Sequence, residues 1–274
     1  RANISYQITD EVMAYAGYAR AEKSGGINMS GLPVNNVNQT VLATAVVRPE
    51  KNETWEAGFK TRLFGGALTF NANAYHIRVR DFQANVVDNA ATIALRSYLA
   101  NIPRVTVKGL EFDSLLRFGS HFVVRGAGSY AKGVYASYPS GPCPIELNPT
   151  AQCNLTGKGL PGLPKWSGSL GGEYVLPLPV TGVDGEAFLR ADGFARSRVF
   201  GDATDSAFTI IRGYTLVNAS IGYRTPTWEV ALFARNLFDQ NFLQNVTVQA
   251  GNSGLILGTP SDPRMFGITL RVNH

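Results

Sequence analysis

Charged residues are scarce in this sequence, and long hydrophobic runs are missing. Lysine, arginine, aspartate and glutamate make up 16% of the 274 residues, against roughly 25% in ordinary soluble domains. No run approaches the roughly 18 consecutive apolar residues of a membrane-spanning helix, and the N-terminal stretch RANISYQITD lacks the apolar core of a secretory signal. The composition therefore excludes a helical membrane protein and provides few charges to cover a soluble surface.

Residue types that serve metal binding and catalysis are also sparse. The three histidines, His76, His121 and His274, are separated by whole predicted strands and have no carboxylate or thiol at ligand spacing. Glu111 and Asp113 share one strand face, which favours a structural pair over an acid–base couple, and no serine has a nucleophile-elbow setting. Basic and acidic residues alternate, which argues against nucleic-acid binding. We therefore predict a protein that is not an enzyme and has no metal site, cofactor or nucleic-acid partner.

The sequence is instead rich in the signals of β structure. In 53-ETWEAGFKTRLF-64, the apolar Trp55, Ala57 and Phe59 alternate with Glu56, Gly58 and Lys60, which is the period of a two-sided strand. The same alternation predicts about eleven strands, at 2–9, 12–22, 53–64, 66–82, 107–118, 120–132, 164–176, 186–198, 214–224, 227–238 and 264–273.

The connections between these strands alternate in length. Tight turns are expected around Asp10, 64–66, 118–120, 177–184 and 225–227, and long polar connections at 24–49, 83–104, 133–163, 199–211 and 239–263. All tight turns then lie at one end of the sheet and all long loops at the other. This asymmetry is typical of an outer-membrane barrel, which has short periplasmic turns and long extracellular loops, and a Greek-key sandwich has no reason to show it.

The two faces of the predicted strands support a barrel in lipid. The polar face carries ionisable residues in mid-strand, which suit a wet lumen or a polar plug but not a dry core; they are Glu56, Lys60, Arg62, Glu111, Asp113, Arg117, Arg125, Glu173, Arg190, Asp192, Arg224, Glu229, Arg235 and Arg271. The apolar face carries aromatic residues near strand ends, where rings favour the boundary between water and lipid. We therefore expect the apolar face to contact lipid.

The two cysteines lie close together in one predicted external loop, 143-CPIELNPTAQC-153. A pair in that place, without a third metal ligand, predicts a Cys143–Cys153 disulfide formed in the oxidising periplasm. Closing so short a loop stabilises the folded chain by roughly 2 to 3 kcal/mol.

Several segments, spread in order along the chain, carry a family resemblance. The run 49-PEKNETWEAGFKTRLFGGALTFNANAYHIRVRDF-82 resembles a strand pair in the barrel of TonB-dependent outer-membrane receptors, and so do 12-VMAYAGYARAEKSGGIN-28, 105-VTVKGLEFD-113, 232-LFARNLFDQNF-242 and 262-DPRMFGITLRV-272. The resemblance implies that residues 1–274 form the C-terminal half of a 22-stranded barrel in the outer membrane of a Gram-negative bacterium. The plug and the TonB-contacting box would then precede Arg1, outside this chain.

The same resemblance implies a function in active transport. Such receptors bind a scarce nutrient, most commonly a ferric siderophore, and import it through the plug with energy from the TonB complex. The implied partners are that nutrient, TonB, and the lipid and lipopolysaccharide of the outer membrane. A net charge of +5 favours an anionic chelate, and the candidate substrate-binding residues are the arginines near the loop-side strand ends: Arg78, Arg80, Arg96, Arg196 and Arg198. Lipopolysaccharide phosphates are an alternative partner for arginines at this rim.

Two other classes of protein fit part of the pattern. A passive porin or autotransporter-type pore shares the barrel but has no plug, and a soluble β module, such as an adhesin domain, shares the alternation. The terminal residue is a further departure, because the resembled receptors end on an aromatic residue that faces lipid, whereas this chain ends on His274. We interpret His274 as a natural departure or as the first residue of a tag.

Overall fold

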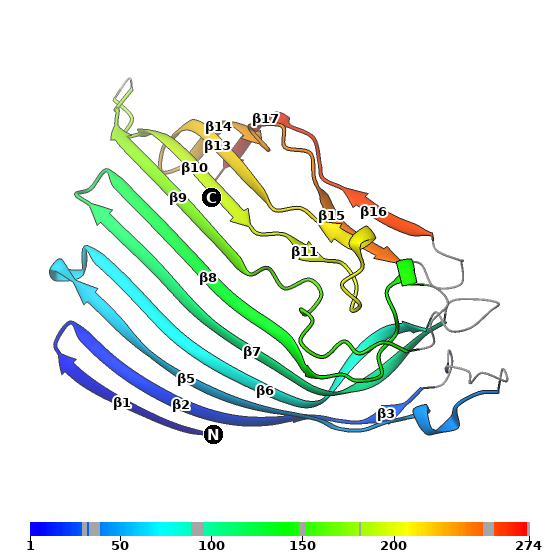
Figure 1. Cartoon of the computed structure of the whole chain (residues 1–274). Helices are drawn as coiled ribbons and strands as arrows, with labels where there is room; N and C mark the ends of the chain where they lie inside the picture. The colour runs from blue at the N-terminus through cyan, green and yellow to red at the C-terminus, as the bar shows by residue number, and fades with distance from the viewer. Residues whose placement is uncertain are drawn as a thin grey trace.

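One large antiparallel sheet dominates the computed structural model, which describes residues 1–28, 32, 39–88, 96–147, 152–180, 182–248 and 255–272. The sheet curves into an open trough of eleven strands (Figure 1). In their order across the sheet, the strands are β1 (Ala2–Thr9), β2 (Val12–Lys23), β5 (Glu50–Leu63), β6 (Leu68–Asp88), β7 (Arg96–Phe118), β8 (Phe122–Ser137), β9 (Trp166–Pro177), β10 (Glu186–Arg196), β13 (Tyr214–Arg224), β14 (Trp228–Arg235) and β17 (Met265–Val272). The predicted strand count and the all-β fold class are confirmed.

The predicted sorting of the connections is also confirmed. Successive strands pair as antiparallel neighbours, so the tight turns gather at one end of the sheet and the long loops at the other (Figure 1). The turn between β5 and β6 is the short 3₁₀ segment η2 (Phe64–Gly66), in which Phe64, Gly65 and Gly66 have φ angles of 56°, 63° and 91°. The two glycines follow from this geometry, because a left-handed backbone is strained for residues with a side chain.

One expectation about the loops was wrong. The stretch 83–104 was predicted as a connection, yet β6 runs on to Asp88 and β7 begins at Arg96, so most of it is strand. Three of the four other long connections contain short paired strands: β3 (Gly26–Ile27) with β4 (Val46–Val47), β11 (Val199–Phe200) with β12 (Ile210–Ile211), and β15 (Leu243–Val248) with β16 (Ile256–Pro260). Three further 3₁₀ segments lie in loops: η1 (Leu42–Thr44), η3 (Ile145–Leu147) and η4 (Ala207–Thr209). Residues within a loop find backbone partners in the same loop, and the alternation of the main strands does not report this pairing.

The sequence motif 236-NLFD-239 explains how the chain leaves β14. Asn236 has a φ of 50° and is 3% exposed. Its side-chain amide donates to the carbonyls of Gln240 and Asp262, and its side-chain oxygen accepts from the Gln240 N–H. Asp239 accepts from the Arg264 N–H at 3.0 Å. The two polar side chains thus join the end of β14 to the start of β17, which are separated in the sequence by the β15–β16 hairpin.

The pairing register places the residues of each face as the alternation predicts. Across β2, β5 and β6, Tyr18 lies opposite Trp55 and Trp55 opposite His76, while Phe59 lies opposite Ala72. This face is largely apolar and exposed, ending on β17 with Phe266, Ile268, Leu270 and Val272 at 60 to 71% exposure. None of the described helical segments is long and apolar enough to cross a membrane. The position of His274 lies outside the described residues.

The polarity of the two faces reverses toward the loop end of β5 to β8. From the row of Trp55 and His76, which also holds Lys108, the outer face carries charged residues such as Arg78, whereas Val79 and Val105 on the inner face are at most 5% exposed. This reversal is expected where strands leave lipid, because the outer face then meets water and the inner face packs against loops.

Candidate ligand-binding site

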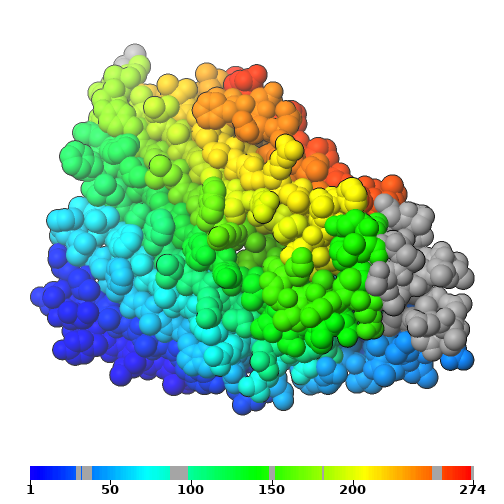
Figure 2. Space-filling model, viewed as in Figure 1, coloured from blue at the N-terminus to red at the C-terminus, as the bar shows by residue number. Residues whose placement is uncertain are grey.

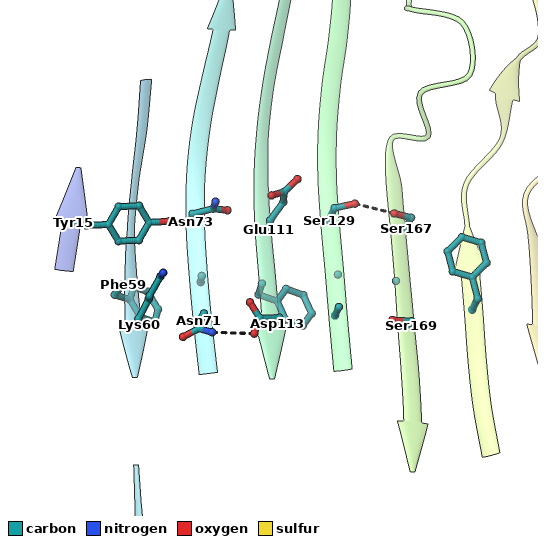
Figure 3. A pocket seen from close by; sticks show the side chains of 16 residues that line it. Tyr15, Phe59, Lys60, Asn71, Asn73, Glu111, Asp113, Ser129, Ser167 and Ser169 are labelled. Atoms are coloured by element: carbon teal, nitrogen blue, oxygen red, sulfur yellow. Dashed lines mark hydrogen bonds between the residues drawn. The ribbon is translucent and has the colours of Figure 1, made fainter. Parts of the chain in front are cut away.

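The inner face has two hollows, of which the first is a polar wall in the middle of the sheet (Figure 3). Its volume is about 480 Å³, and its side chains come from neighbouring strands. Some of its polar groups bond to one another: Asn71 donates to Asp113 at 2.9 Å, and the hydroxyls of Ser129 and Ser167 lie 2.8 Å apart. The wall is polar and carries charges of both signs, Lys60 with Glu111 and Asp113.

The second hollow is an apolar cavity of about 750 Å³ at the loop end of the trough, within the usual range of roughly 300 to 1,000 Å³ for small-molecule sites. It lies between the inner ends of β6, β7 and β8 and three long loops. Its lining includes Phe82, Ala84, Val86, Val107, Tyr135, Pro142, Cys143, Ile145, Leu160, Pro161, Leu163, Asp202, Ala203, Thr204, Val248 and Leu257. One carboxylate and no basic side chain stand among these described lining residues, so the cavity suits an uncharged, largely apolar group.

The loop after β8 forms the longest wall of this cavity and folds back over the inner side of the sheet (Figure 1). Backbone bonds prolong β8 into a hairpin: Tyr135 N donates to Lys158 O at 3.0 Å, and Leu155 N donates to Tyr138 O at 2.8 Å. The Cys143–Cys153 disulfide closes the end of this hairpin, with a Cα–Cα distance of 4.9 Å. The predicted pairing of the cysteines is thus present in the structure. It holds Cys143 at the cavity.

The loop after β10 forms a second wall and is bonded to the first. Glu146, in η3, accepts from the Ser206 hydroxyl at 2.7 Å and from the Ala207 N–H at 2.9 Å. Burial opposes ionisation of Glu146, but these hydrogen bonds outweigh it and hold its pKa below the usual value. Figure 2 shows the two loops, green and yellow, in contact with each other over this end of the sheet. The carboxylate of Glu146 therefore links the two loops that line the cavity through hydrogen bonds.

Two buried polar atoms beside the cavity have no hydrogen-bond partner among the residues that the structure describes. The Tyr135 side chain is 0% exposed, and its hydroxyl is unpaired although the ring lines the cavity. Asp205 accepts from the Gly159 N–H at 3.1 Å through one oxygen, while its other carboxylate oxygen is buried and unpaired. Burial raises the pKa of Tyr135, and the negative charges of Asp205 and Asp202 raise it further. Leaving a buried polar group unpaired is costly, so both atoms would be stabilised by a further hydrogen bond.

Of the five arginines predicted to bind substrate, the four whose side chains are described do not line this cavity. Arg78 and Arg80 lie on the outer face of β6, and the Arg78 guanidinium lies 5.2 Å from the Trp55 ring centroid on that face. Arg96 begins β7, and its side chain lies outside the described residues. Arg198 is exposed in the loop after β10.

Arg196, in contrast, lies at the inner end of β10. Its guanidinium lies 4.8 Å from the Tyr214 ring centroid, and Tyr214 in turn stacks on Phe242 at 3.7 Å. The Nε atom of Arg196 is buried and has no hydrogen-bond partner among the described residues. Among the four of these arginines whose side chains are described, Arg196 is the one that combines the inner face with an unsatisfied donor.

Sequence reasoning missed Tyr135, Asp205 and the apolar lining of β6, although the sequence contains a signal for the last. In β6 the inward apolar residues are Ile77 and Val79 before Asp81, but Phe82 and Ala84 after it, so the alternation shifts by one residue. Asp81 has a φ of 53°, which re-aims the side chains that follow. The one-residue shift of the apolar alternation at Asp81 is thus the sequence feature that indicates this wall of the cavity.

Comparison with known proteins identifies the family. Residues 1–237 match the family described as TonB dependent receptor-like, beta-barrel. A curated relative, the ferric-pyoverdine receptor PbuA of a Pseudomonas species, is 23% identical over 99% of this chain and 29% of its own length.

Solved structures share the fold across nearly the whole chain. The ferric yersiniabactin uptake receptor FyuA of Yersinia pestis superposes with a TM-score of 0.73 at 16% identity, over 98% of this chain and 36% of that receptor. The ferripyoverdine receptor of Pseudomonas aeruginosa gives 0.65 at 14%, over 98% and 32%, and the copper transporter OprC gives 0.67 at 16%, over 98% and 38%.

The chain spans about a third of the length of these relatives. Its strand order, its sorted loops and the family match agree, and they place it in the outer membrane of a Gram-negative bacterium. The chain belongs to the TonB-dependent receptor-like β-barrel family.

Proposed function

We propose that this chain is the C-terminal part of a receptor that binds a ferric siderophore at the cell surface and imports it with energy from the TonB complex. In this proposal, a plug encoded outside residues 1–274 fills the barrel and makes the contact with TonB. The polar wall of Figure 3 is the surface that would face this plug, since its charged and amide groups lie on the inner side of the membrane-spanning strands. The outer face would contact lipid and lipopolysaccharide. A passive pore is less favoured because the relatives named above are receptors and a transporter.

The apolar cavity is the observation that carries the proposal. A siderophore complex is a metal enclosed by a largely organic scaffold, and an apolar cavity with one unpaired hydroxyl suits a piece of such a scaffold. Tyr135 would donate the hydrogen bond that its hydroxyl lacks in the free protein. Because no base lines the described part of the cavity, the negative charge of a ferric chelate would be met elsewhere on the inner side. Arg196 and the exposed Arg198 are the candidates for that contact.

A single-atom change tests this assignment in the full-length receptor. Tyr135→Phe removes the hydroxyl and leaves the ring, so the fold should be retained while affinity for the ferric siderophore falls about three- to tenfold, the value of one hydrogen bond. The measurement is binding of a panel that includes ferric pyoverdine and ferric yersiniabactin, followed by uptake of the labelled iron. Tyr130→Phe is the matched control, because Tyr130 lies on the same strand but on the outer face.

The possible results of these experiments distinguish an error in the proposed transport function from an error in the proposed binding site. Uptake of a ferric siderophore that continues without TonB, or binding of copper in place of every ferric chelate, would contradict the proposed function. If Tyr135→Phe bound the ferric siderophore as tightly as the wild type, the proposed function would stand, but the cavity would not be the ligand-binding site.

A further inference from the structure

The charged side chains of the inner face are paired on one side of the trough and not on the other. On β5 and β7 this face carries a set that we call the open wall: Glu56, Lys60, Arg62, Glu111, Asp113 and Arg117. None of these side chains forms an ion pair with a described residue, although both signs of charge are present (Figure 3). The register keeps opposite charges apart, since Asn71 lies between Lys60 and Asp113.

From β8 to β17 the charged side chains of the inner face are paired within the sheet. The set that we call the paired wall consists of Arg125, Glu173, Glu186, Arg190, Asp192, Arg224, Glu229 and Arg271. Arg196 and Arg235, at the loop ends of β10 and β14, stand outside this set. Acids and bases are equal in number within it, so the paired wall is neutral without a partner from outside the sheet.

Glu173 is the centre of the paired wall. Arg190 contacts its carboxylate at 2.8 Å and Arg224 at 2.9 Å. Arg224 also pairs with Glu186, and both guanidinium groups lie over the ring of Phe188, at 5.2 and 5.3 Å from its centroid. These contacts join β9, β10 and β13 into one network of charges.

The two walls should respond differently to a plug that fills the barrel. A charge that is removed from water without a partner is strongly destabilised, so the open wall requires opposite charges on the plug. The paired wall already has its partners, and it loses none of them when the plug moves away and water enters. Separation of the plug is therefore less costly along the paired wall.

The paired wall also leads away from the proposed ligand-binding cavity. The loop after β10 and the β15–β16 hairpin line this cavity, and both are continuous with strands of the paired wall (Figure 1). Inward residues on either side of β10 are small, such as Ser169 on β9 and Ser220 on β13. Small side chains obstruct a passage less than large ones, so a ligand that leaves the cavity meets little hindrance there.

We propose that ion pairs fasten the plug to the open wall, and that the imported ligand passes along the paired wall, between the plug and β9, β10 and β13. This inference rests on the transport function proposed above. The plug then presents acidic groups to the bases of the open wall and basic groups to its acids. One side of the plug stays in place while the other side separates from the barrel.

Cysteine labelling in cells tests where the passage opens. Ser220→Cys on the paired wall and Thr69→Cys beside the open wall are matched, because both positions are half-buried on the inner face. The two native cysteines are joined in the disulfide and do not react. When the ferric siderophore that the wild type imports is added to cells that contain TonB, Ser220→Cys should react severalfold faster with a small maleimide, and Thr69→Cys should react at an unchanged rate.

Uptake of labelled iron is measured in the same cells. Equal acceleration at both positions would overturn the proposed passage, and so would a larger acceleration at Thr69→Cys or none at Ser220→Cys while uptake proceeds. If the wild type imported no ferric siderophore, the transport function itself would be contradicted, and the passage with it.

A second pair of variants tests the fastening. Lys60→Gln with Asp113→Asn removes one base and one acid from the open wall, so the plug should loosen and the ion conductance of the full-length receptor in planar bilayers should rise severalfold without ligand. Arg125→Gln with Asp192→Asn removes one ion pair from the paired wall and should leave the conductance at the wild-type value. Heat-modifiable mobility checks that both barrels are folded. Wild-type conductance in the open-wall variant, or an equal rise in both variants, would contradict the proposal.

Discussion

At the scale of the residue, burial destabilises the ionised carboxylate of Asp205, and its surroundings offset this free-energy cost only in part. It has a φ of 57°, and one of its carboxylate oxygens is buried without a partner. Burial raises the pKa of Asp205, and the hydrogen bond from Gly159 only partly opposes this. A carboxyl whose pKa is raised by folding stabilises the folded loops fully below its unfolded pKa of about 3.9. That contribution is lost as the pH rises through the higher folded value.

Asp205→Asn should therefore stabilise the loops at neutral pH, because it removes a poorly solvated charge while asparagine tolerates a left-handed backbone. The gain is expected to be less than about 1 kcal/mol, since solvent still screens the group. It should shrink as the pH falls through the raised pKa and vanish near pH 4. Hydrogen exchange of residues 153–160, corrected for the intrinsic pH dependence of exchange, measures it. Glu146→Gln should instead destabilise the loops at neutral pH, because folding lowers the pKa of Glu146. A loss of exchange protection in Asp205→Asn at neutral pH would contradict the assignment of a destabilising charge to Asp205.

At the scale of the element, each strand has one face for lipid and one for the interior, and β17 shows this most clearly. Leu270 is 67% exposed and lies opposite Val230, whereas Thr269 lies opposite Ala231, which is 6% exposed on the inner face. Adjacent residues of one strand thus meet different surroundings. The burial of charge in hydrocarbon should separate them energetically.

Leu270→Arg in the full-length barrel should destabilise it by up to about 2 to 4 kcal/mol, the cost of an arginine facing lipid at the midplane, whereas Thr269→Arg should be far milder. Reversible unfolding of the receptor in lipid vesicles measures the free energy of each variant. If both sites tolerated arginine equally, the assignment of the two faces would have to be given up.

At the scale of the whole molecule, the eleven strands form an open sheet whose edges are β1 and β17. These two strands do not pair with each other in the described structure, and every residue of β1 is exposed. Unpaired backbone groups in lipid cost several kcal/mol each, and an open edge also invites pairing with other chains. We therefore expect both edges to be covered by further strands of a complete barrel.

A protein made of residues 1–274 alone should consequently fail to close. We expect it to aggregate or to form edge-paired oligomers in detergent, without a heat-modifiable, protease-resistant monomer; gel mobility with and without boiling, together with trypsin digestion, tests this. The full-length receptor, treated identically, is the control. A stable monomer of the 1–274 protein would refute the interpretation of the chain as part of a larger barrel.

The sequence by itself determined the eleven main strands, their two faces and the tight turns at one end of the sheet, but not the extensions of β6 and β7 beyond it. Alternation of period two is a local property, because each residue of a strand such as β17 must suit either lipid or the interior. The length of a turn also depends on residues that are adjacent in the sequence. The cysteine pairing was also predictable, since Cys143 and Cys153 share one loop. What only the tertiary structure decided is where the loops meet. The cavity joins Phe82, Tyr135 and Ala203 from distant segments, and a single left-handed residue, Asp81, re-aims the side chains that line it. Arg78 and Arg80 have the parity of the outward Ala72 and Ala74, which places them on the outer face, but only the register across neighbouring strands shows that Arg80 lies between Lys51 and Arg104, away from the cavity.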